Sequence, residues 1–146
     1  MANLVPYAFP VELLSGTHNF ASNTCKLALY TASPYTSAST VYVVTTESSG
    51  TEYSAGGNTL SGNAVSNSAN YATVDFTDSV WGSPTPATFS AAYGAIYNSS
   101  AANKLVVILD FGGTKSCSNG TFTVTFPSPT SGSPTGADAL LSIKSN

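Results

Sequence analysis

Alternation of apolar and polar residues with a period of two constrains this chain more than any other feature of its sequence. In residues 121–126 (TFTVTF), Phe122, Val124 and Phe126 alternate with threonines. Residues 25–31 (CKLALYT) and 71–78 (YATVDFTD) alternate in the same way, with one apolar face formed by Cys25, Leu27 and Leu29 and the other by Ala72, Val74 and Phe76. Successive side chains of a β-strand point to opposite faces, so we expect half-buried strands with one dry and one wet face.

Other stretches depart from this alternation. Residues 91–98 (AAYGAIYN) and 104–111 (KLVVILDF) are apolar along most of their length, which is typical of central strands covered on both faces. Residues 139–144 (ALLSIK) predict a short closing strand. Residues 39–47 (STVYVVTTE) favour a strand by composition, with a short helical turn before Glu47 as the alternative. One or two helical turns fit ahead of Gly16 in the stretch FPVELLSG.

Turn-forming residues separate these stretches, for example GSPTP at 82–86 and FGGTKSCSNG at 111–120. We interpret the Pro/Ser-rich residues 127–136 as a solvated connection between two strands rather than a linker between domains. A chain of 146 residues fits one domain. We therefore predict that residues 1–146 form a single-domain all-β fold, either a β-sandwich or jelly-roll-like. The predicted core includes Leu27, Leu29, Val74, Phe76, Ile96, Val107, Leu109, Phe122 and Val124.

Charged residues make up only 8% of the chain, which excludes several kinds of partner. The sequence has no arginine, its formal net charge is −3, and its cations are Lys26, Lys104, Lys115 and Lys144. Nucleic-acid binding requires cationic side chains that displace counterions from phosphates, and anionic membrane surfaces attract the same side chains. No stretch reaches the roughly 18 apolar residues of a membrane-spanning segment, and the N-terminal residues do not fit a signal peptide. We expect neither nucleic acid nor a membrane as partner, and synthesis in the cytoplasm without export.

Residues 50–60 (GTEYSAGGNTL) raise the question of a phosphate-binding loop or a nucleophile elbow. A Walker-type loop needs a Lys and a Ser or Thr directly after its glycines, whereas Asn-Thr-Leu follows Gly57 here. A nucleophile elbow needs Gly-x-Ser-x-Gly, which the sequence lacks. We therefore interpret Gly56 and Gly57 as part of a turn or bulge that requires positive φ angles.

Few other residues are candidates for chemistry. His18 is the only histidine, so a Ser-His-Asp set would depend on it and a metal site would need mainly carboxylates. An acid–base pair of the glycosidase type would draw on Asp75, Asp78 and Asp110. Simpler roles account for all three, namely the wet face of a strand for Asp75, a cap of the turn before Trp81 for Asp78, and a strand end for Asp110. We expect no catalytic residue, no cofactor and no bound metal.

Cys25 and Cys117 are too few for a tetrahedral metal site. In a protein made in the cytoplasm we expect both thiols to stay reduced and to be unnecessary for folding. A long-loop disulfide between them, formed if the protein leaves the cell, is the alternative. For the same reason we expect the Asn-x-Ser/Thr sequences at Asn98 and Asn119 to be ordinary loop asparagines rather than glycosylation sites.

The order of motifs between Cys25 and Phe126 carries a resemblance to a known family. The motifs are CKLALYTAS, TTESSGTEYSAGGNTL, ATVDFTDSVW, FSAAYGAIYN and LVVILDFGGTKSCSNGTFTVTF. This series resembles a family of small structural proteins encoded by tailed bacteriophages and prophages. Members carry a strand ending in Leu-Tyr-Thr-Ser, an Asn-Glu-Val-x-Gly-x-Gly-Tyr-x-Ala-Gly-Gly-x-x-Leu stretch, an Asp-Val-x-Trp turn, an Ala-x-Tyr-Ala-x-Ile-Tyr strand and an Asp-Phe-Gly turn before Asn-Gly-x-Phe-Thr-Val. This chain departs where Glu52 replaces a glycine, and where a Pro/Ser-rich loop precedes the C-terminal strand.

The resemblance implies a virion component without enzymatic activity. We favour a capsid decoration or cement protein on the outer head surface, because a compact domain without fibrous repeats suits a place between capsid subunits. Its partners would be the major capsid protein and, as a homo-oligomer, itself. One alternative is a tail or fibre component, including a glycan-binding one that uses Trp81 or Tyr35. Another is a small hydrolase in which His18 contacts a Ser and a carboxylate. The expected location is the virion, after synthesis in the host cytoplasm.

Residues 1–16 hold more apolar surface than a chain end usually leaves in water. Pro6 and Pro10 favour an extended form and remove backbone donors, so we predict an extended segment that acts as an assembly arm. Deleting residues 1–10 should then leave a folded monomer that no longer assembles. The alternative is that the segment folds back over one end of its own sandwich. The predicted interface residues, which would insert into a neighbouring subunit or the capsid shell, are Leu4, Val5, Tyr7, Phe9 and Val11.

Overall fold

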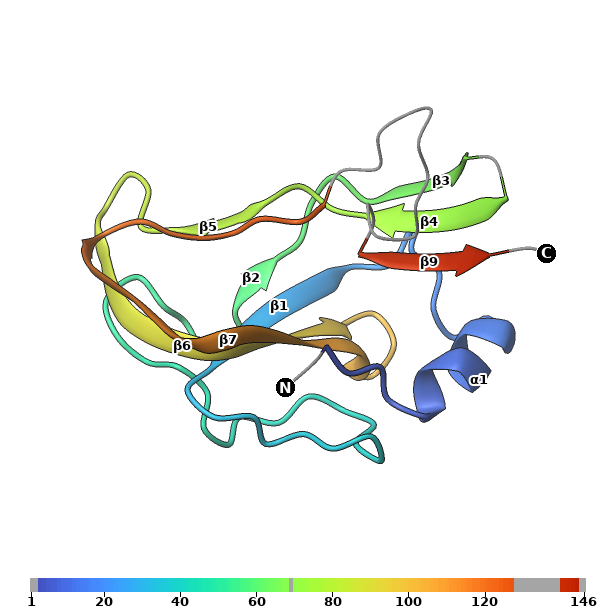
Figure 1. Cartoon of the computed structure of the whole chain (residues 1–146), viewed down its shortest axis with the longest axis horizontal. Helices are drawn as coiled ribbons and strands as arrows, with labels where there is room; N and C mark the ends of the chain where they lie inside the picture. Colours follow the sequence, from blue (N-terminus) through green and yellow to red (C-terminus); the bar gives the residue numbers. More distant parts are fainter. Residues whose placement is uncertain (1–2, 69, 128–139, 145–146) are drawn as a thin grey trace.

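The computed structural model describes residues 3–68, 70–127 and 140–144, and it shows an all-β domain with one short helix (Figure 1). The strand pairs are antiparallel. The all-β prediction is therefore confirmed, and the closing strand near the C-terminus is present as β9. In chain order the elements are α1 (Ala8–Leu14), β1 (Cys25–Tyr30), β2 (Asn58–Thr59), β3 (Ala64–Ser68), β4 (Tyr71–Asp75), β5 (Ser79–Trp81), β6 (Ala87–Asn98), β7 (Lys104–Gly120), β8 (Phe122–Val124) and β9 (Leu141–Lys144).

The main sheet has the strand order β2-β1-β6-β7. β6 lies between β1 and β7 and is buried along most of its length, as predicted for a central strand. In β1, every residue except Lys26 is buried. The prediction that Ala28 and Tyr30 face water is therefore wrong, because other parts of the chain cover both faces of the main sheet.

β7 is longer than the sequence indicated. The glycine-rich residues 111–120, predicted to form a turn, remain part of the strand, and Lys115 lies opposite Ala91 on β6. Asp110 lies opposite Tyr93, so residues 111–114 form a bulge opposite a single residue of β6. Asp110 is therefore inside β7 and not at a strand end as predicted. A bulge bends its strand, and beyond this one β6 and β7 curve towards β5 and β8 (Figure 1).

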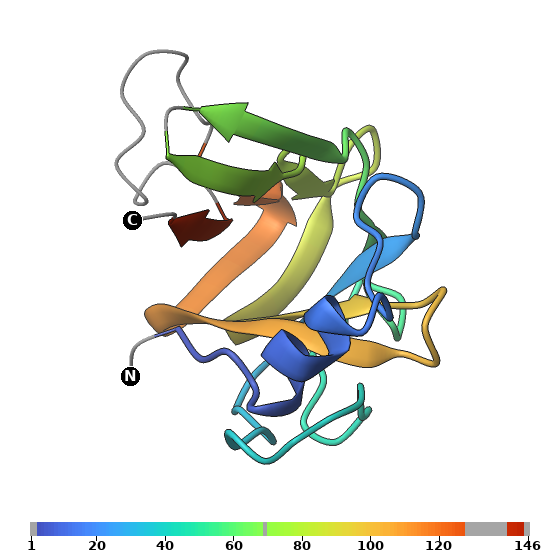
Figure 2. The ribbon, with the colours of Figure 1, turned by 90° about the vertical axis from the view of Figure 1, so that its right-hand side faces the viewer.

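A second layer faces the main sheet and contains the strand groups β3-β4-β9 and β5-β8 (Figure 2). The chain runs directly from β4 into β5. β3 and the segment before it lie on one side of β4 and β5. The contact is made by the Thr77 amide, between β4 and β5, which donates to the carbonyl of Ser61, just before β3 (2.9 Å). On the other side lie β9, opposite β4, and β8, opposite β5. β8 and β9 thus form the same edge of the second layer. Most of the predicted Pro/Ser-rich connection between them, residues 128–136, lies outside the described residues.

The core between the two layers contains eight of the nine predicted core residues, and Val74 is partly buried against it. The alternation predicted for residues 121–126 is confirmed, because Phe122, Val124 and Phe126 are buried and the threonines are exposed. In β4 the alternation fails. Thr73 is buried there, where its hydroxyl shares a hydrogen bond of 2.8 Å with that of Ser66.

Residues 31–57 cover the opposite face of the main sheet without forming a regular strand. The stretch 39–47, predicted to favour a strand, makes only isolated bridges, from Val41 to Lys104 and from Glu47 to Tyr30. A turn precedes Glu47, whose amide donates to the Val44 carbonyl (3.1 Å). This segment and the N-terminal residues pack on a second apolar cluster formed by Ala28, Tyr30, Tyr35, Ala95, Tyr97, Leu105 and Ile108.

The glycine pair at Gly56 and Gly57 is a turn, as interpreted, with φ angles of +90° and +67°. The Glu47 carboxylate organises it by accepting hydrogen bonds from the Gly56 amide (2.6 Å) and from the Tyr53 hydroxyl (2.8 Å). A Cβ on Gly57 would overlap the backbone carbonyl of Leu27 in β1. The two glycines therefore serve the architecture, because they let the chain return to the main sheet at β2.

The N-terminal segment folds back over its own domain. Leu4 pairs with Ile108 on the outer edge of β7 through two hydrogen bonds of 2.8 Å, and Pro6 is fully buried. The prediction of an extended arm is wrong for residues 8–14, which form α1, whereas the one or two helical turns before Gly16 are confirmed. Pro10 fits the helix because it occupies the first turn, where backbone amides have no partner within the helix.

Candidate functional site: an apolar docking surface

One side of α1 is apolar and exposed to solvent. Tyr7, Val11 and Leu14 recur at positions i, i+4 and i+7, so they lie on one face of the helix, which we call the α1 face. Their side chains are 75%, 68% and 90% exposed. On another side of the same helix, Phe9 is buried and Leu13 is partly buried against the core between the layers. Helix α1 is thus anchored by one side and offers the other to solvent.

A groove of about 650 Å³ lies next to α1, and we call it the α1 groove. Its walls are α1, residues 18–21 and the sheet β3-β4-β9, which lies above α1 in Figure 1. Among its lining residues, Val5, Val65 and Ile143 are 41%, 55% and 58% exposed. Among the residues that the structure describes, the lining contains no Asp, Glu, Lys or Arg. The α1 face and the α1 groove together form what we call the docking surface.

Sequence reasoning identified part of this surface. Of the five predicted interface residues, Val5, Tyr7 and Val11 are exposed and belong to it. Leu4 does not, because it pairs with β7, and Phe9 lines the groove but is buried and holds α1 against the domain. Leu14 was missed, although its helical spacing from Tyr7 and Val11 is visible in the sequence. Val65 and Ile143 were also missed, and no local signal could have placed them beside α1.

A partly buried polar cluster fixes α1 to the domain. The Glu12 carboxylate bonds to His18 Nε2 (3.2 Å) and to Lys104 Nζ (2.8 Å). Burial raises the pKa of Glu12, but its hydrogen bonds with Lys104 and His18 and the charge of Lys104 outweigh that effect, and the pKa lies below the usual value. The His18 ring stacks on Phe20, with centroids 5.9 Å apart and planes within 8°. This cluster ties the helix to the start of β7.

Both ring nitrogens of His18 have partners. The Asn98 side-chain amide donates to Nδ1 (3.2 Å), so Nε2 carries the proton and donates to Glu12. The hydrolase alternative needed a serine on this ring, and the described hydrogen bonds of His18 reach Glu12 and Asn98 instead. Asn98 is fully buried and also donates to Asn23 (2.8 Å), so its side chain is not presented to a glycosylating enzyme in the folded protein.

The three aspartates occupy separate places. Burial raises the pKa of Asp75, and the nearby Asp78 carboxylate raises it further. Asp78 accepts a hydrogen bond from the Phe126 amide (2.9 Å), so it joins two strands of the second layer instead of capping the turn before Trp81. Asp110 lies in the main sheet and accepts from the Gly112 amide (2.9 Å). Across the described ranges, no group of three or more His, Cys, Asp or Glu side chains is placed to hold a metal ion.

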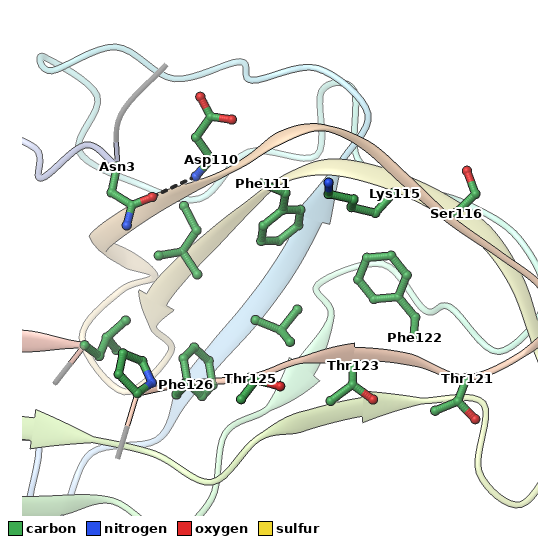
Figure 3. A pocket seen from close by; sticks show the side chains of 14 residues that line it. Asn3, Asp110, Phe111, Lys115, Ser116, Thr121, Phe122, Thr123, Thr125 and Phe126 are labelled. Carbon is green, nitrogen blue, oxygen red and sulfur yellow. Dashed lines mark hydrogen bonds between the residues drawn. The ribbon is translucent and has the colours of Figure 1, made fainter. Parts of the chain in front are cut away.

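A second cleft, of about 830 Å³, lies between the outer edge of β7 and β8 (Figure 3). Phe111, Phe122 and Phe126 form its apolar part, and Lys115 and several Ser and Thr residues lie along it. The residues named for the glycan-binding alternative, Trp81 and Tyr35, are both buried and give no exposed stacking surface.

The two cysteines are free, so the disulfide alternative is wrong. Cys25 lies opposite Asn98 and Cys117 opposite Phe89, near the two ends of β6. At about 3.3 Å per residue this separation is roughly 30 Å along the strand, far beyond the reach of a disulfide. Burial raises the pKa of the Cys25 thiol to about 11.

Comparisons with known proteins give no relative for this chain, since no family model, no curated protein and no solved structure matches it. No helix in the described part of the chain is long and apolar enough to span a bilayer.

Proposed function

We propose that this protein is a structural component of a tailed-bacteriophage virion, acting as a capsid decoration or cement protein on the outer head surface. The assignment to a virion rests on the order of motifs from Cys25 to Phe126 and its resemblance to the phage family. The docking surface is the structural observation that supports a binding role, because it is apolar, exposed and built on a helix anchored to the domain. In this proposal the protein acts by binding the major capsid protein.

The size of the docking surface is sufficient for a specific contact. A large side chain exposes roughly 150 Å² when fully accessible. The six exposed apolar residues of the surface, each 41–90% exposed, therefore present on the order of 600 Å², at the upper end of the patches found on monomers. A standard interface buries about 800 Å² on each partner, so this patch with a polar rim fits one.

The composition of virions tests the assignment directly. Particles produced by the phage that encodes this chain would be purified, separated into heads and tails, and analysed by quantitative mass spectrometry. We expect peptides of this chain in the head fraction, in a fixed ratio to the major capsid protein. Enrichment in tails would move the protein to the tail or fibre, and absence from both fractions would refute the virion assignment.

Point variants test the docking surface better than deletion of residues 1–10, which would also remove the buried Pro6 and Phe9. Heads lacking the protein would be titrated with wild-type protein and with Leu14→Asp. Full burial of a leucine contributes about 1.5–3 kcal/mol, so its loss should weaken binding by at least about tenfold. Val44→Asp is the matched control, because Val44 is 62% exposed and lies in residues 31–57, outside the docking surface. Equal affinities of the two variants would rule out this surface as the contact.

A further inference from the structure

The outer edge of β8 has no strand partner in the part of the chain that the structure describes. β8 pairs with β5 alone, through Ser79–Val124, Val80–Thr123 and Trp81–Phe122. Alternate backbone groups of a strand point to opposite sides, so half of the amides and carbonyls of β8 are directed away from β5. An edge of this kind is a template for pairing with another strand.

The sequence of this edge lacks the charges and prolines that usually protect an exposed strand, although β8 itself is short. Folded proteins block exposed edges with charged side chains, prolines or bulges. Residues 121–126 contain no charge and no proline, and they alternate Thr with Phe or Val throughout. The exposed Thr123 and Thr125 and the buried Phe122, Val124 and Phe126 are all residue types that favour strands.

There is room for a further strand beside this edge. The cleft of about 830 Å³ lies directly against β8, and Phe111 and Phe122 point into the space between β7 and β8 (Figure 3). Phe111 is only partly buried. The neighbouring edge of the main sheet accepts backbone pairing, because Leu4 forms an isolated bridge with the outer side of β7 at Ile108 just before the cleft begins.

A second copy of this chain is the occupant that the edge fits best, because the edge is complementary to itself. When two such strands pair antiparallel about a two-fold axis, Phe and Val lie beside Phe and Val on the inner face, and Thr lies beside Thr on the outer face. Residues 121–126 bring no charge to the contact, and the charged residues that line the cleft beside them, Asp110 and Lys115, have opposite signs. A two-fold contact of this kind is the commonest way in which soluble chains associate.

We propose that the protein forms a two-fold dimer in which β8 of one copy pairs antiparallel with β8 of the other. The second layers of the two copies then form one continuous sheet. This contact is separate from the docking surface, so the dimer carries two docking surfaces and would bind a capsid bivalently. The dimer itself does not depend on the proposed function.

Sedimentation velocity over a range of concentrations tests the dimer. We expect the wild-type protein to show a monomer–dimer equilibrium, and Thr123→Lys to weaken association by at least about tenfold, since two lysines would face each other across the axis. Thr45→Lys is the matched control, because Thr45 is exposed in a turn far along the chain from β8. Leu14→Asp should leave the dimer unchanged. Far-UV circular dichroism would verify that each variant is folded.

Oxidative cross-linking identifies the contact itself. Thr123→Cys, at the centre of β8, should form a disulfide-linked dimer, whereas Thr45→Cys and the wild-type protein should not. A wild-type protein that stays monomeric at every concentration would refute the proposal. So would a dimer that survives Thr123→Lys unweakened, or one that Leu14→Asp abolishes, because either result places the contact elsewhere.

Discussion

Substitution of Gly57 by alanine tests the role of the paired glycines. Gly57 has a φ angle of +67°, and a Cβ there would overlap the Leu27 carbonyl oxygen and press on the Ala28 Cα. Both contacts are backbone atoms of the central strand β1, so no side-chain rotation relieves them. The turn that contains Gly57 brings the chain to β2, whose residue Asn58 pairs with Leu27. Gly57→Ala must therefore displace β2 from β1 or distort β1 itself.

The expected cost separates into two contributions. A left-handed backbone conformation costs a residue with a Cβ about 1–2 kcal/mol. Overpacking costs about 1–3 kcal/mol, and rigid backbone neighbours place this site at the upper end. We therefore expect Gly57→Ala to lower the free energy of unfolding by about 3–5 kcal/mol. Gly112→Ala is the matched control, because Gly112 has nearly the same φ angle, +70°, but a Cβ added there would meet no atom within 4 Å. It should lose only the first contribution.

Urea unfolding followed by the fluorescence of Trp81, the only tryptophan and a buried one, measures both variants against the wild-type protein. The difference between the two variants gives the cost of the contact with β1, because the backbone strain is common to both. Equal free energies of unfolding for Gly57→Ala and Gly112→Ala would refute the argument that close approach to β1 requires a glycine here.

The packing and charges of the domain lead to three further predictions. Phe122→Ala should lower the free energy of unfolding by about 3–5 kcal/mol, because Phe122 packs on Phe89 with ring centroids 5.0 Å apart. A loss below about 1 kcal/mol in urea unfolding would contradict the place of Phe122 in the core. Glu12→Gln should destabilise the protein at pH 7, because it removes the carboxylate that binds Lys104 and His18. The pKa of Glu12 is lowered on folding, so the stabilisation by the carboxylate is present above the usual pKa and disappears as pH falls through the lowered value. The unfolding midpoints of the two proteins should therefore converge in acid. Cys25 is buried and should resist iodoacetamide at pH 8, whereas Cys117 should react. Reductant should leave Tm unchanged, and an intact disulfide found by mass spectrometry would contradict the prediction that both thiols are free.

Local sequence patterns were sufficient for the fold class and for most of the core. The alternation in residues 121–126 is correct residue by residue, because this strand has one face on the core and the other in water. The glycine turn at Gly56 and Gly57 was also correctly interpreted, because positive φ angles are a local property of the backbone. Both features depend on residues that are close together in the chain.

The same pattern gave wrong predictions where distant segments cover a strand. The alternation in β1 resembles that of β8, yet Ala28 and Tyr30 are buried because residues 31–57 pack on the second face of the main sheet. The glycines at 112 and 113 signalled a turn, but pairing with β6 resumes beyond them and makes their segment a bulge. Competition between a local turn and long-range pairing is not encoded in a short window of sequence.

The docking surface shows the same division between local and distant determinants. The apolar character of residues 4–14 is evident in the sequence, but the choice of which residues are buried required the tertiary structure. Leu4 and Phe9 face the domain, whereas Tyr7, Val11 and Leu14 face solvent, because helix α1 has one side on the core. Val65 and Ile143 join the surface from strands far along the chain. Exposure is decided by what packs from elsewhere, so only the folded arrangement of α1 against β3-β4-β9 brings these apolar residues together.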